Sequence, residues 1–100
     1  MNTRWASPIM DNAWLMLKFT RKYDVDKVII NWENAYAKDY DIQTSLDGRR
    51  WTTVAKVRNS DGGEDEVSFN PTTAQYVRLK CINRATGYGI SIWEMQVLAH

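Results

Sequence analysis

The stretch Tyr40-Asp41-Ile42-Gln43-Thr44-Ser45-Leu46-Asp47-Gly48-Arg49-Arg50-Trp51 decides the fold. Its first half alternates between larger and more polar side chains, which is the two-residue period of a strand with one buried face. Asp47-Gly48 follows, and this dipeptide is typical of hairpin turns because glycine adopts a positive φ angle without strain. The stretch therefore predicts a β-hairpin with a tight turn at Asp47-Gly48, between strands that end near Ser45 and start near Trp51.

Strand-like runs continue along the rest of the chain. Besides 40–45 and 51–57 of the hairpin, they cover residues 14–19, 27–32, 66–69, 75–82 and 90–98. Turn-forming residues separate them: 59–64 is a loop by composition, and the run 66–69 is expected to end at Asn70-Pro71. No segment keeps a helical period over a dozen residues. Seven short strands joined by turns predict an all-β sandwich or jelly roll.

The inward face of each strand gives the expected core, because side chains on a strand alternate between two faces. The residues expected to be buried are Leu15, Leu17, Val28, Ile30, Trp32, Ile42, Val77, Leu79, Met95 and Val97. Trp5, Trp14, Trp51 and Trp93 are also interpreted as core. Arg78 alternates out of phase with the core residues of its strand and is interpreted as structural.

Length and charge limit the possible functions. One hundred residues make one domain, residues 1–100. Thirteen basic and twelve acidic side chains give a net charge of +1, which argues against a nucleic-acid binder with a basic face. No apolar run approaches the roughly 20 residues of a membrane span. Five tryptophans and five tyrosines are amphipathic aromatics, which suit both sandwich cores and wet binding faces.

The single cysteine and the first residues bear on the compartment. Cys81 excludes an internal disulfide, and its place on the strand face of Val77 and Leu79 predicts a buried, inert thiol. The opening residues 1–5 do not resemble a signal peptide. Two alternatives follow: a cytosolic chain, or a piece of a longer exported protein.

Catalytic patterns are nearly absent. The only histidine is His100, the last residue, and nucleophile elbows, zinc-ligand pairs and glycine-rich phosphate loops are missing. Carboxylates cluster at 24–26, 39–41 and 61–66, but no spacing selects the facing pair that a glycosidase needs. We interpret the clusters as solvated turns and edges, with calcium chelation by 61–66 as an alternative. The sequence therefore predicts a protein that is not an enzyme.

Three segments carry a family resemblance. They are Asn2-Thr3-Arg4-Trp5-Ala6-Ser7 with Trp14-Leu15; residues 32–40 running into Ser45-Leu46-Asp47-Gly48 and Trp51; and Tyr76-Val77-Arg78-Leu79 with residues 84–94. In this order they resemble discoidin domains, the coagulation factor V/VIII C-type fold, and most closely the bacterial carbohydrate-binding modules of family 32. The resemblance covers nearly the whole chain.

That family implies a fold and a function. It implies an antiparallel jelly-roll β-sandwich, galactose-binding-domain-like, that binds oligo- or polysaccharide as a lectin does and has no catalytic activity. Such modules usually accompany a polysaccharide-degrading enzyme, so the parent protein would be extracellular or at the cell surface.

The resemblance places a sugar site in loops at one end of the sandwich, expected at residues 8–13, 33–39 and 83–89. Tyr88, between two glycines, is the expected stacking platform, with Tyr36 as a second aromatic candidate. Glu33 and Arg84 would bond sugar hydroxyls or pair with each other. Weaker candidates are Asn34 and Asp11. The galactose-binding members use an arginine in the loop that here reads 33–38, and since none is present, galactose is not favoured.

A structural calcium ion is the implied cofactor. The matching ligands are Thr3, the carbonyl of Trp93 and Glu94, whereas the family's N-terminal strand and its aspartate-bearing loop would precede Met1. Three ligands are few for an ion that takes six to eight oxygens, so we expect weak calcium binding or none. The same comparison suggests a domain truncated at its N-terminus, with an open sheet edge through which a homodimer could form.

The alternative function is a discoidin-type domain that binds a protein partner or a membrane surface. Pro8-Ile9-Met10 would form an apolar loop tip able to enter a bilayer. No Lys/Arg cluster flanks it to attract anionic lipid, and a hydrophobic wall beside a sugar explains these residues as well. Membrane binding is therefore not favoured.

Overall fold

The computed structural model describes residues 2–3, 7–10, 14–33, 36–84 and 92–99. These residues form strands and the connections between them. Among them there is no helix long and apolar enough to span a membrane. The strands are β1 (Asn2–Thr3), β2 (Ser7–Met10), β3 (Trp14–Trp32), β4 (Ala37–Ser45), β5 (Thr52–Val57), β6 (Glu64–Arg84) and β7 (Ile92–Ala99). All pairs are antiparallel, as the all-β prediction requires.

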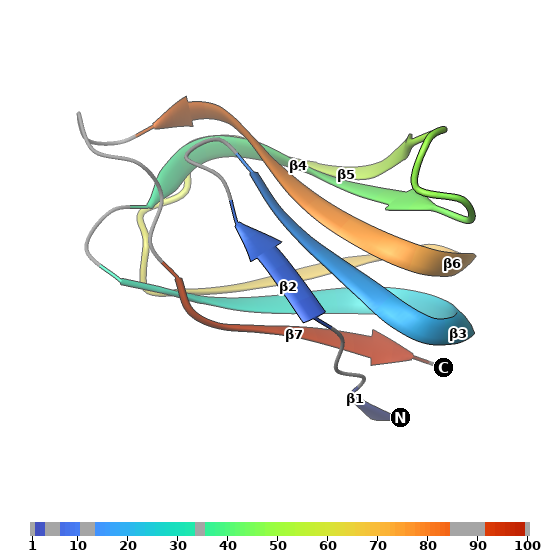
Figure 1. Ribbon diagram of the computed structural model, residues 1–100. Coiled ribbons are helices and arrows are strands. Elements are labelled where there is room, and N and C mark those ends of the chain that lie inside the picture. Colours follow the sequence, from blue (N-terminus) through green and yellow to red (C-terminus); the bar gives the residue numbers. More distant parts are fainter. Residues whose placement is uncertain (1, 4–6, 11–13, 34–35, 85–91, 100) are drawn as a thin grey trace.

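Two long strands give the molecule its two layers. β3 and β6 pair with each other along most of their length, and Figure 1 shows both doubling back at the same end of the molecule. One layer contains β2, the first part of β3, the second part of β6, β4 and β5. The other contains the first part of β6, the second part of β3, β7 and β1. The fold is therefore the predicted antiparallel jelly-roll sandwich.

A bulge in β3 produces its bend. Lys18 pairs with Tyr76 and Tyr23 with Ala74, so β3 has more residues than β6 at this point, which bends a strand. Gln75 Nε2 donates to the carbonyl of Phe19 at 3.1 Å inside the bulge. Just beyond it, Thr73 Oγ1 donates to Asp24 Oδ1 at 2.6 Å. These bonds hold the two bent strands together at the corner.

The core lies between the layers, and the ten residues predicted for it are all buried. Phe19, Val25, Ala37, Tyr40, Ala74 and Ala99 complete it. Phe19 and Tyr23 meet edge to face at 5.8 Å at the bend. Each fully buried aliphatic or aromatic side chain contributes about 1.5–3 kcal/mol through removal from water.

Three core predictions were wrong. Trp14, Trp51 and Cys81 are half-buried. Trp51 lies against the guanidinium of Arg78, whose Cζ is 4.1 Å from the ring centroid, on the outer side of the sheet. An amphipathic ring can satisfy its apolar face with a cation as well as with a core. Arg78 also donates to Gln43 Oε1 at 2.6 and 3.0 Å, so its structural role is confirmed.

Several strand boundaries also differ from the prediction. The four runs 14–19, 27–32, 66–69 and 75–82 are two continuous strands, so Asn70-Pro71 lies within β6 rather than ending a strand. Residues 8–10 belong to β2, which pairs with the first part of β3, and are not a loop tip. Their pairing removes the argument for an apolar loop that enters a bilayer.

The hairpin forms where it was predicted, but its connection is longer than a tight turn. Thr44 pairs with Thr52, and residues 46–51 lie between the strands. Gly48 has φ +78°, as the Asp-Gly prediction required. Asp47 Oδ1 accepts hydrogen bonds from the backbone N–H groups of Arg49 and Arg50 at 2.8 and 3.0 Å. This carboxylate replaces the backbone bonds of a two-residue turn.

Candidate functional site

The candidate site lies at the end of the sandwich opposite the bends of β3 and β6. Here the connections from β3 to β4 and from β5 to β6 lie close together, beside the C-terminal end of β6 (Figure 1). The register pairs Ala37 with Arg84 and Asp39 with Asn83, which brings the end of the predicted sugar loop 33–39 beside the start of the predicted loop 83–89. The described part of the site therefore consists of Glu33, Tyr36, residues 58–63 and Asn83.

Asp65 holds the strand ends and the 58–63 loop together at this end of the sandwich. Its Oδ2 accepts hydrogen bonds from Trp32 Nε1 at 2.9 Å, from the Tyr40 hydroxyl at 2.7 Å and from Ser60 Oγ at 2.8 Å. The Trp32 and Tyr40 rings meet edge to face at 5.4 Å. Burial, followed by the hydrogen bond and the negative charge of Asp65, raises the pKa of the Tyr40 hydroxyl well above its usual range. Tyr40 therefore remains a proton donor at all physiological pH values.

Asp39 joins two of the loops. Its Oδ1 accepts from the backbone N–H of Asn59 at 2.9 Å, and its Oδ2 accepts from Asn83 Nδ2 at 2.8 Å. These bonds, with the backbone bond to Asn59 the largest cause, hold the pKa of the Asp39 carboxyl below its usual range. Asn59 itself has φ +61°, a conformation that asparagine tolerates better than most residues. The 58–63 loop is thus fixed to the end of β6 by the Asp39 carboxylate.

Tyr36 lies across the same loop. A Cβ atom added to Gly62 would lie 3.0 Å from Cδ1 of the Tyr36 ring, so the ring rests on the backbone of this glycine. The ring is half-buried and packs against the edge of the core. A ring supported on one side by backbone is pre-positioned to present its remaining surface to a ligand.

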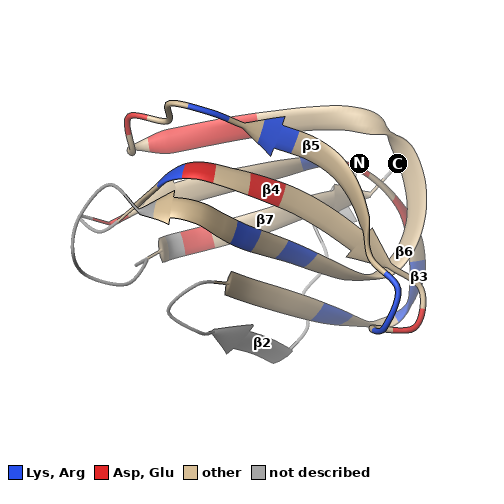
Figure 2. Ribbon diagram, turned by 90° about the horizontal axis from the view of Figure 1, so that it is seen from above, with Lys and Arg blue, Asp and Glu red and all other residues tan. Residues whose placement is uncertain are grey.

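Charge at this end is mainly negative. Figure 2 shows Asp and Glu positions along β4 and at the start of β6 near the loops. Glu33, Asp39 and Asp61 lie in or beside the described loops. The nearby Arg58 is paired with Asp41 at 3.1 Å. An acidic loop end favours ligands that carry hydrogen-bond donors or positive charge.

The structure places the predicted sugar residues as follows. Glu33 and Tyr36 are half-buried at the loop end, and the backbone of Arg84 ends β6 beside Ala37. These three positions are therefore brought to one end of the sandwich. Tyr88, Asn34 and Asp11 lie outside the described residues.

Two of the predicted calcium ligands, Thr3 of β1 and Glu94 of β7, lie at different positions along the length of β7. Thr3 pairs with Leu98, whereas Glu94 pairs with Asn31 near the opposite end of the strand. Four residues of strand separate the two positions by roughly 13 Å. The Glu94 carboxylate accepts a hydrogen bond from Gln96 Nε2. Within the described ranges no three acidic, histidine or cysteine side chains lie close enough together to hold a metal ion.

Sequence reasoning missed Asp39, Asn83 and Asp65. The acidic groups 39–41 and 61–66 were interpreted as solvated edges, yet Asp39 and Asp65 accept two and three hydrogen bonds from different segments. Their donors are distant in sequence, so no local pattern marks them. The one available signal was the position of Asp65, which lies between the predicted loop 59–64, with its serine and glycine residues, and the predicted strand 66–69.

A jelly-roll sandwich with several connecting loops gathered at one end is typical of β-sandwich binding domains. Residues 1–95 match the family description "F5/8 type C domain", and the chain belongs to this family. The recognition of a discoidin-type domain is thereby confirmed. No curated protein sequence matches this chain significantly.

Solved structures agree with this assignment. Chitosan-binding module 1 derived from a chitosanase/glucanase of Paenibacillus sp. IK-5 is 37% identical, with a TM-score of 0.82 over 98% of this chain and 74% of the module. Module 2 of the same enzyme, in complex with chitotriose, is 36% identical, with a TM-score of 0.83 over 99% and 76%. The Clostridium perfringens module CpGH89CBM32-5, in complex with GalNAc-β-1,3-galactose, shares 22% identity, with a TM-score of 0.79 over 86% and 65%, and supports the fold alone.

Proposed function

We propose that this domain is a carbohydrate-binding module for chitosan or a closely related β-linked polysaccharide. One observation carries the proposal: the two chitosan-binding modules are 36–37% identical to this chain over 98–99% of its length. The domain itself would be non-catalytic, tethered to a glycan-active enzyme, and extracellular, in a bacterial protein.

The charge of the loop end supports this ligand. Chitosan is built from glucosamine, whose protonated amino groups are positive. Glu33, Asp39 and Asp61 would attract such groups, and Arg58 is already paired with Asp41. A carboxylate that bonds an ammonium group makes a charge-assisted hydrogen bond, about twice as strong as a neutral one.

The sugar-contacting residues are proposed from the sequence and from the described geometry. Tyr88 is the stacking platform and Tyr36, which rests on Gly62, is the second aromatic contact. Glu33 and Arg84 are the polar anchors. Asn34 and Asp11 complete the expected set.

The first experiment measures binding of a glucosamine trisaccharide by calorimetry. Tyr88→Ala and Tyr36→Ala should each weaken binding, by up to about tenfold for the platform, because a ring stack adds on the order of 1 kcal/mol to the apolar area that it covers. Tyr88→Phe and Tyr36→Phe keep the rings and should bind nearly as the parent does. Unchanged affinity in both alanine variants would show that the site is elsewhere.

The second experiment separates charge recognition from general sugar binding. The glucosamine trisaccharide is compared with its N-acetylated form, which has no ammonium groups. Glu33→Gln should reduce affinity for the first and leave the second almost unchanged. If neither trisaccharide binds, chitosan is the wrong ligand, and a glycan array should then identify the polysaccharide.

Two further properties belong to the same proposal. We propose that calcium binds weakly or not at all, and calorimetry that shows sub-micromolar affinity would contradict this. We also propose a homodimer formed through an open sheet edge. The first part of β6 pairs with β3 alone among the described residues, which leaves one side of its backbone for a second chain. Sedimentation at high concentration that detects monomer alone would refute the dimer.

A further inference from the structure

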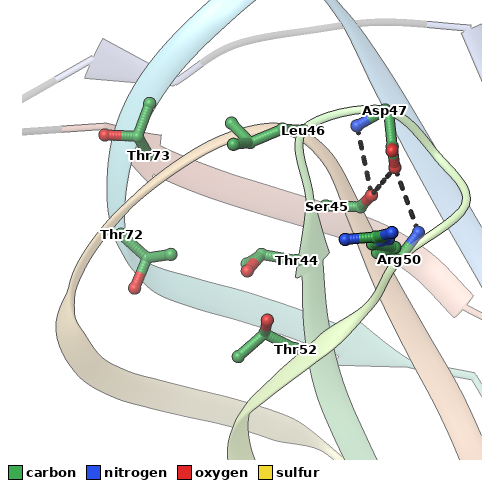
Figure 3. A pocket seen from close by; sticks show the side chains of 8 residues that line it. All are labelled: Thr44, Ser45, Leu46, Asp47, Arg50, Thr52, Thr72 and Thr73. Carbon is green, nitrogen blue, oxygen red and sulfur yellow. Dashed lines mark hydrogen bonds between the residues drawn. The ribbon is translucent and has the colours of Figure 1, made fainter.

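A pocket lies at the other end of the sandwich, far from the candidate sugar loops. Its volume is about 460 Å³, within the range of roughly 300–1,000 Å³ of small-molecule sites. The lining residues are Thr44, Ser45, Leu46, Asp47, Arg50, Thr52, Thr72 and Thr73 (Figure 3). They come from the end of β4, the hairpin connection, the start of β5 and the bend of β6.

Two hydroxyl groups in the pocket have no protein partner. Thr44 is 2% exposed, yet within the described chain its side chain makes no hydrogen bond. Thr52 pairs with Thr44 across the hairpin, and its hydroxyl is likewise without a bond among the residues described. Figure 3 shows Thr44 directly above Thr52, with Thr72 facing both from the other side. Hydroxyls that make no bond within the described chain can donate to, or accept from, a ligand hydroxyl.

The opposite wall supplies acceptors. Thr72 donates its proton to Asn70 O at 3.0 Å, which leaves its oxygen able to accept, whereas the Thr73 hydroxyl is directed to Asp24 Oδ1 at 2.6 Å and points away from Thr44 in Figure 3. Asp47 uses only Oδ1 for the hairpin, where Ser45 Oγ and two backbone N–H groups donate to it. These backbone bonds lower the pKa of the Asp47 carboxyl to about 2, so the group is an anionic acceptor at neutral pH.

Arg50 and Leu46 complete the rim. The backbone of Arg50 is held by Asp47, while its guanidinium has no ion pair in the described part of the chain and presents five N–H donors. Its charge balances that of Asp47, so the rim has no net charge. Leu46 is 51% exposed at the pocket edge and offers an apolar surface.

We propose that this pocket is a second saccharide-binding site, for a neutral hexose unit of a polysaccharide. A hexose ring carries hydroxyls that both donate and accept, and an apolar C–H face. The pocket matches these with threonine and arginine donors, threonine and aspartate acceptors, and Leu46. Because β4 has nine residues and spans roughly 30 Å, this site cannot be part of the loop site at the other end.

The inference goes beyond the proposed function, since it adds a site with a different charge preference. Its test is a nuclear magnetic resonance titration of the ¹⁵N-labelled chain with a neutral β-1,4-linked glucose trisaccharide. Amide signals of Thr44, Leu46 and Thr52 should shift with sugar concentration. Signals of Tyr36, Asp39 and Asn83 report separately on the loop end. A glucosamine trisaccharide that moves no loop-end signal counts against the proposed function alone.

Matched variants make the test specific. Arg50→Gln removes the rim donors and should weaken pocket binding roughly tenfold. Arg49→Gln is the control, because Arg49 has the same charge on the same connection but does not line the pocket. Thr44→Val removes the Thr44 hydroxyl at almost constant volume and should also weaken binding, with folding checked by its melting curve. No shift of the pocket signals, or equal affinity in Arg50→Gln and Arg49→Gln, would overturn the inference.

Discussion

At the scale of single residues, a few side-chain oxygens fix the connections of this domain. Ser45 Oγ accepts from the backbone N–H of Gly48 at 2.8 Å. The carboxylates of Asp47 and Asp65 accept hydrogen bonds from groups in the connections, such as the Arg49 N–H and the Ser60 hydroxyl. Carboxylates suit this role because two oxygens accept several bonds at once. The stability of these connections should therefore depend on both the shape and the charge of the side chains that hold them.

Substitutions at Gly48 and Gly63 allow the cost of backbone strain to be distinguished from the cost of steric overlap. Both have positive φ angles, of +78° and +68°. A Cβ atom at Gly48 would lie 3.1 Å from Cζ of Tyr76, whereas nothing lies within 4 Å at Gly63. We expect Gly63→Ala to lose about 1–2 kcal/mol for the left-handed conformation and Gly48→Ala to lose more, because Tyr76 must also move. Urea unfolding of both variants measures this, and equal losses would mean that the Tyr76 ring yields freely.

Asp47 makes stability depend on acid. Its folded pKa of about 2 lies below the value of about 3.9 for unfolded aspartate. A depressed pKa gives stability that is complete above the unfolded pKa and is lost as the pH falls through the folded pKa. The parent should therefore lose stability between about pH 4 and pH 2, and Asp47→Asn should be less stable at pH 7 but flatter over that interval. Parallel pH profiles would exclude this role of Asp47.

At the scale of elements, Asp65 links strands that the chain order separates. Through Trp32, Tyr40 and Ser60 it joins the end of β3, the start of β4, the 58–63 loop and β6. The candidate sugar loops extend from these same strand ends. A change at Asp65 should therefore alter stability and ligand binding together.

Asp65→Ala and Tyr40→Phe test this link. The alanine variant leaves the Trp32 N–H and the fully buried Tyr40 hydroxyl unpaired, at about 1–3 kcal/mol each. Tyr40→Phe removes a donor together with its need for a partner and should lose only about 1 kcal/mol. The indole N–H resonance of Trp32 should shift in Asp65→Ala and much less in Tyr40→Phe. An unshifted resonance in Asp65→Ala would contradict the bond.

The strands show where sequence reasoning succeeds and fails. Alternation found the core face of the long strands, and the Asp47-Gly48 dipeptide found the position of the hairpin connection but not its length, because these signals are local. The bends of β3 and β6 were not predicted, since the strand runs were expected to stop at residue 19 and at Asn70-Pro71. Their pairing is set by partners far along the chain, which composition does not record. The family resemblance led us to expect Tyr36 and Glu33 at the site. The hydrogen bonds of Asp65 were not expected, because their donors are distant in the sequence.

At the scale of the whole molecule, one sandwich presents two chemically different ends. The loop end combines an aromatic ring with acidic groups, and the hairpin end combines unpaired hydroxyls with a balanced Arg50 and Asp47 rim. The fold class could be predicted because strand alternation, turn residues and family motifs all agreed. The hairpin pocket could not, since its walls come from two separate segments of the chain, 44–52 and 72–73.

The long ladder between β3 and β6 also sets how fast the chain reaches its native state. Trp14 pairs with Lys80, and even the nearest described ladder pair, Asn31 with Glu64, closes a loop of about thirty residues. Such high contact order places refolding in the millisecond-to-second range. Once the inner rungs form, each outer rung closes a shorter loop, so the ladder should zip outward. Val28→Ala, near the inner rungs, should then slow refolding, whereas Val77→Ala, nearer the outer rungs, should mainly accelerate unfolding, as stopped-flow tryptophan fluorescence would reveal.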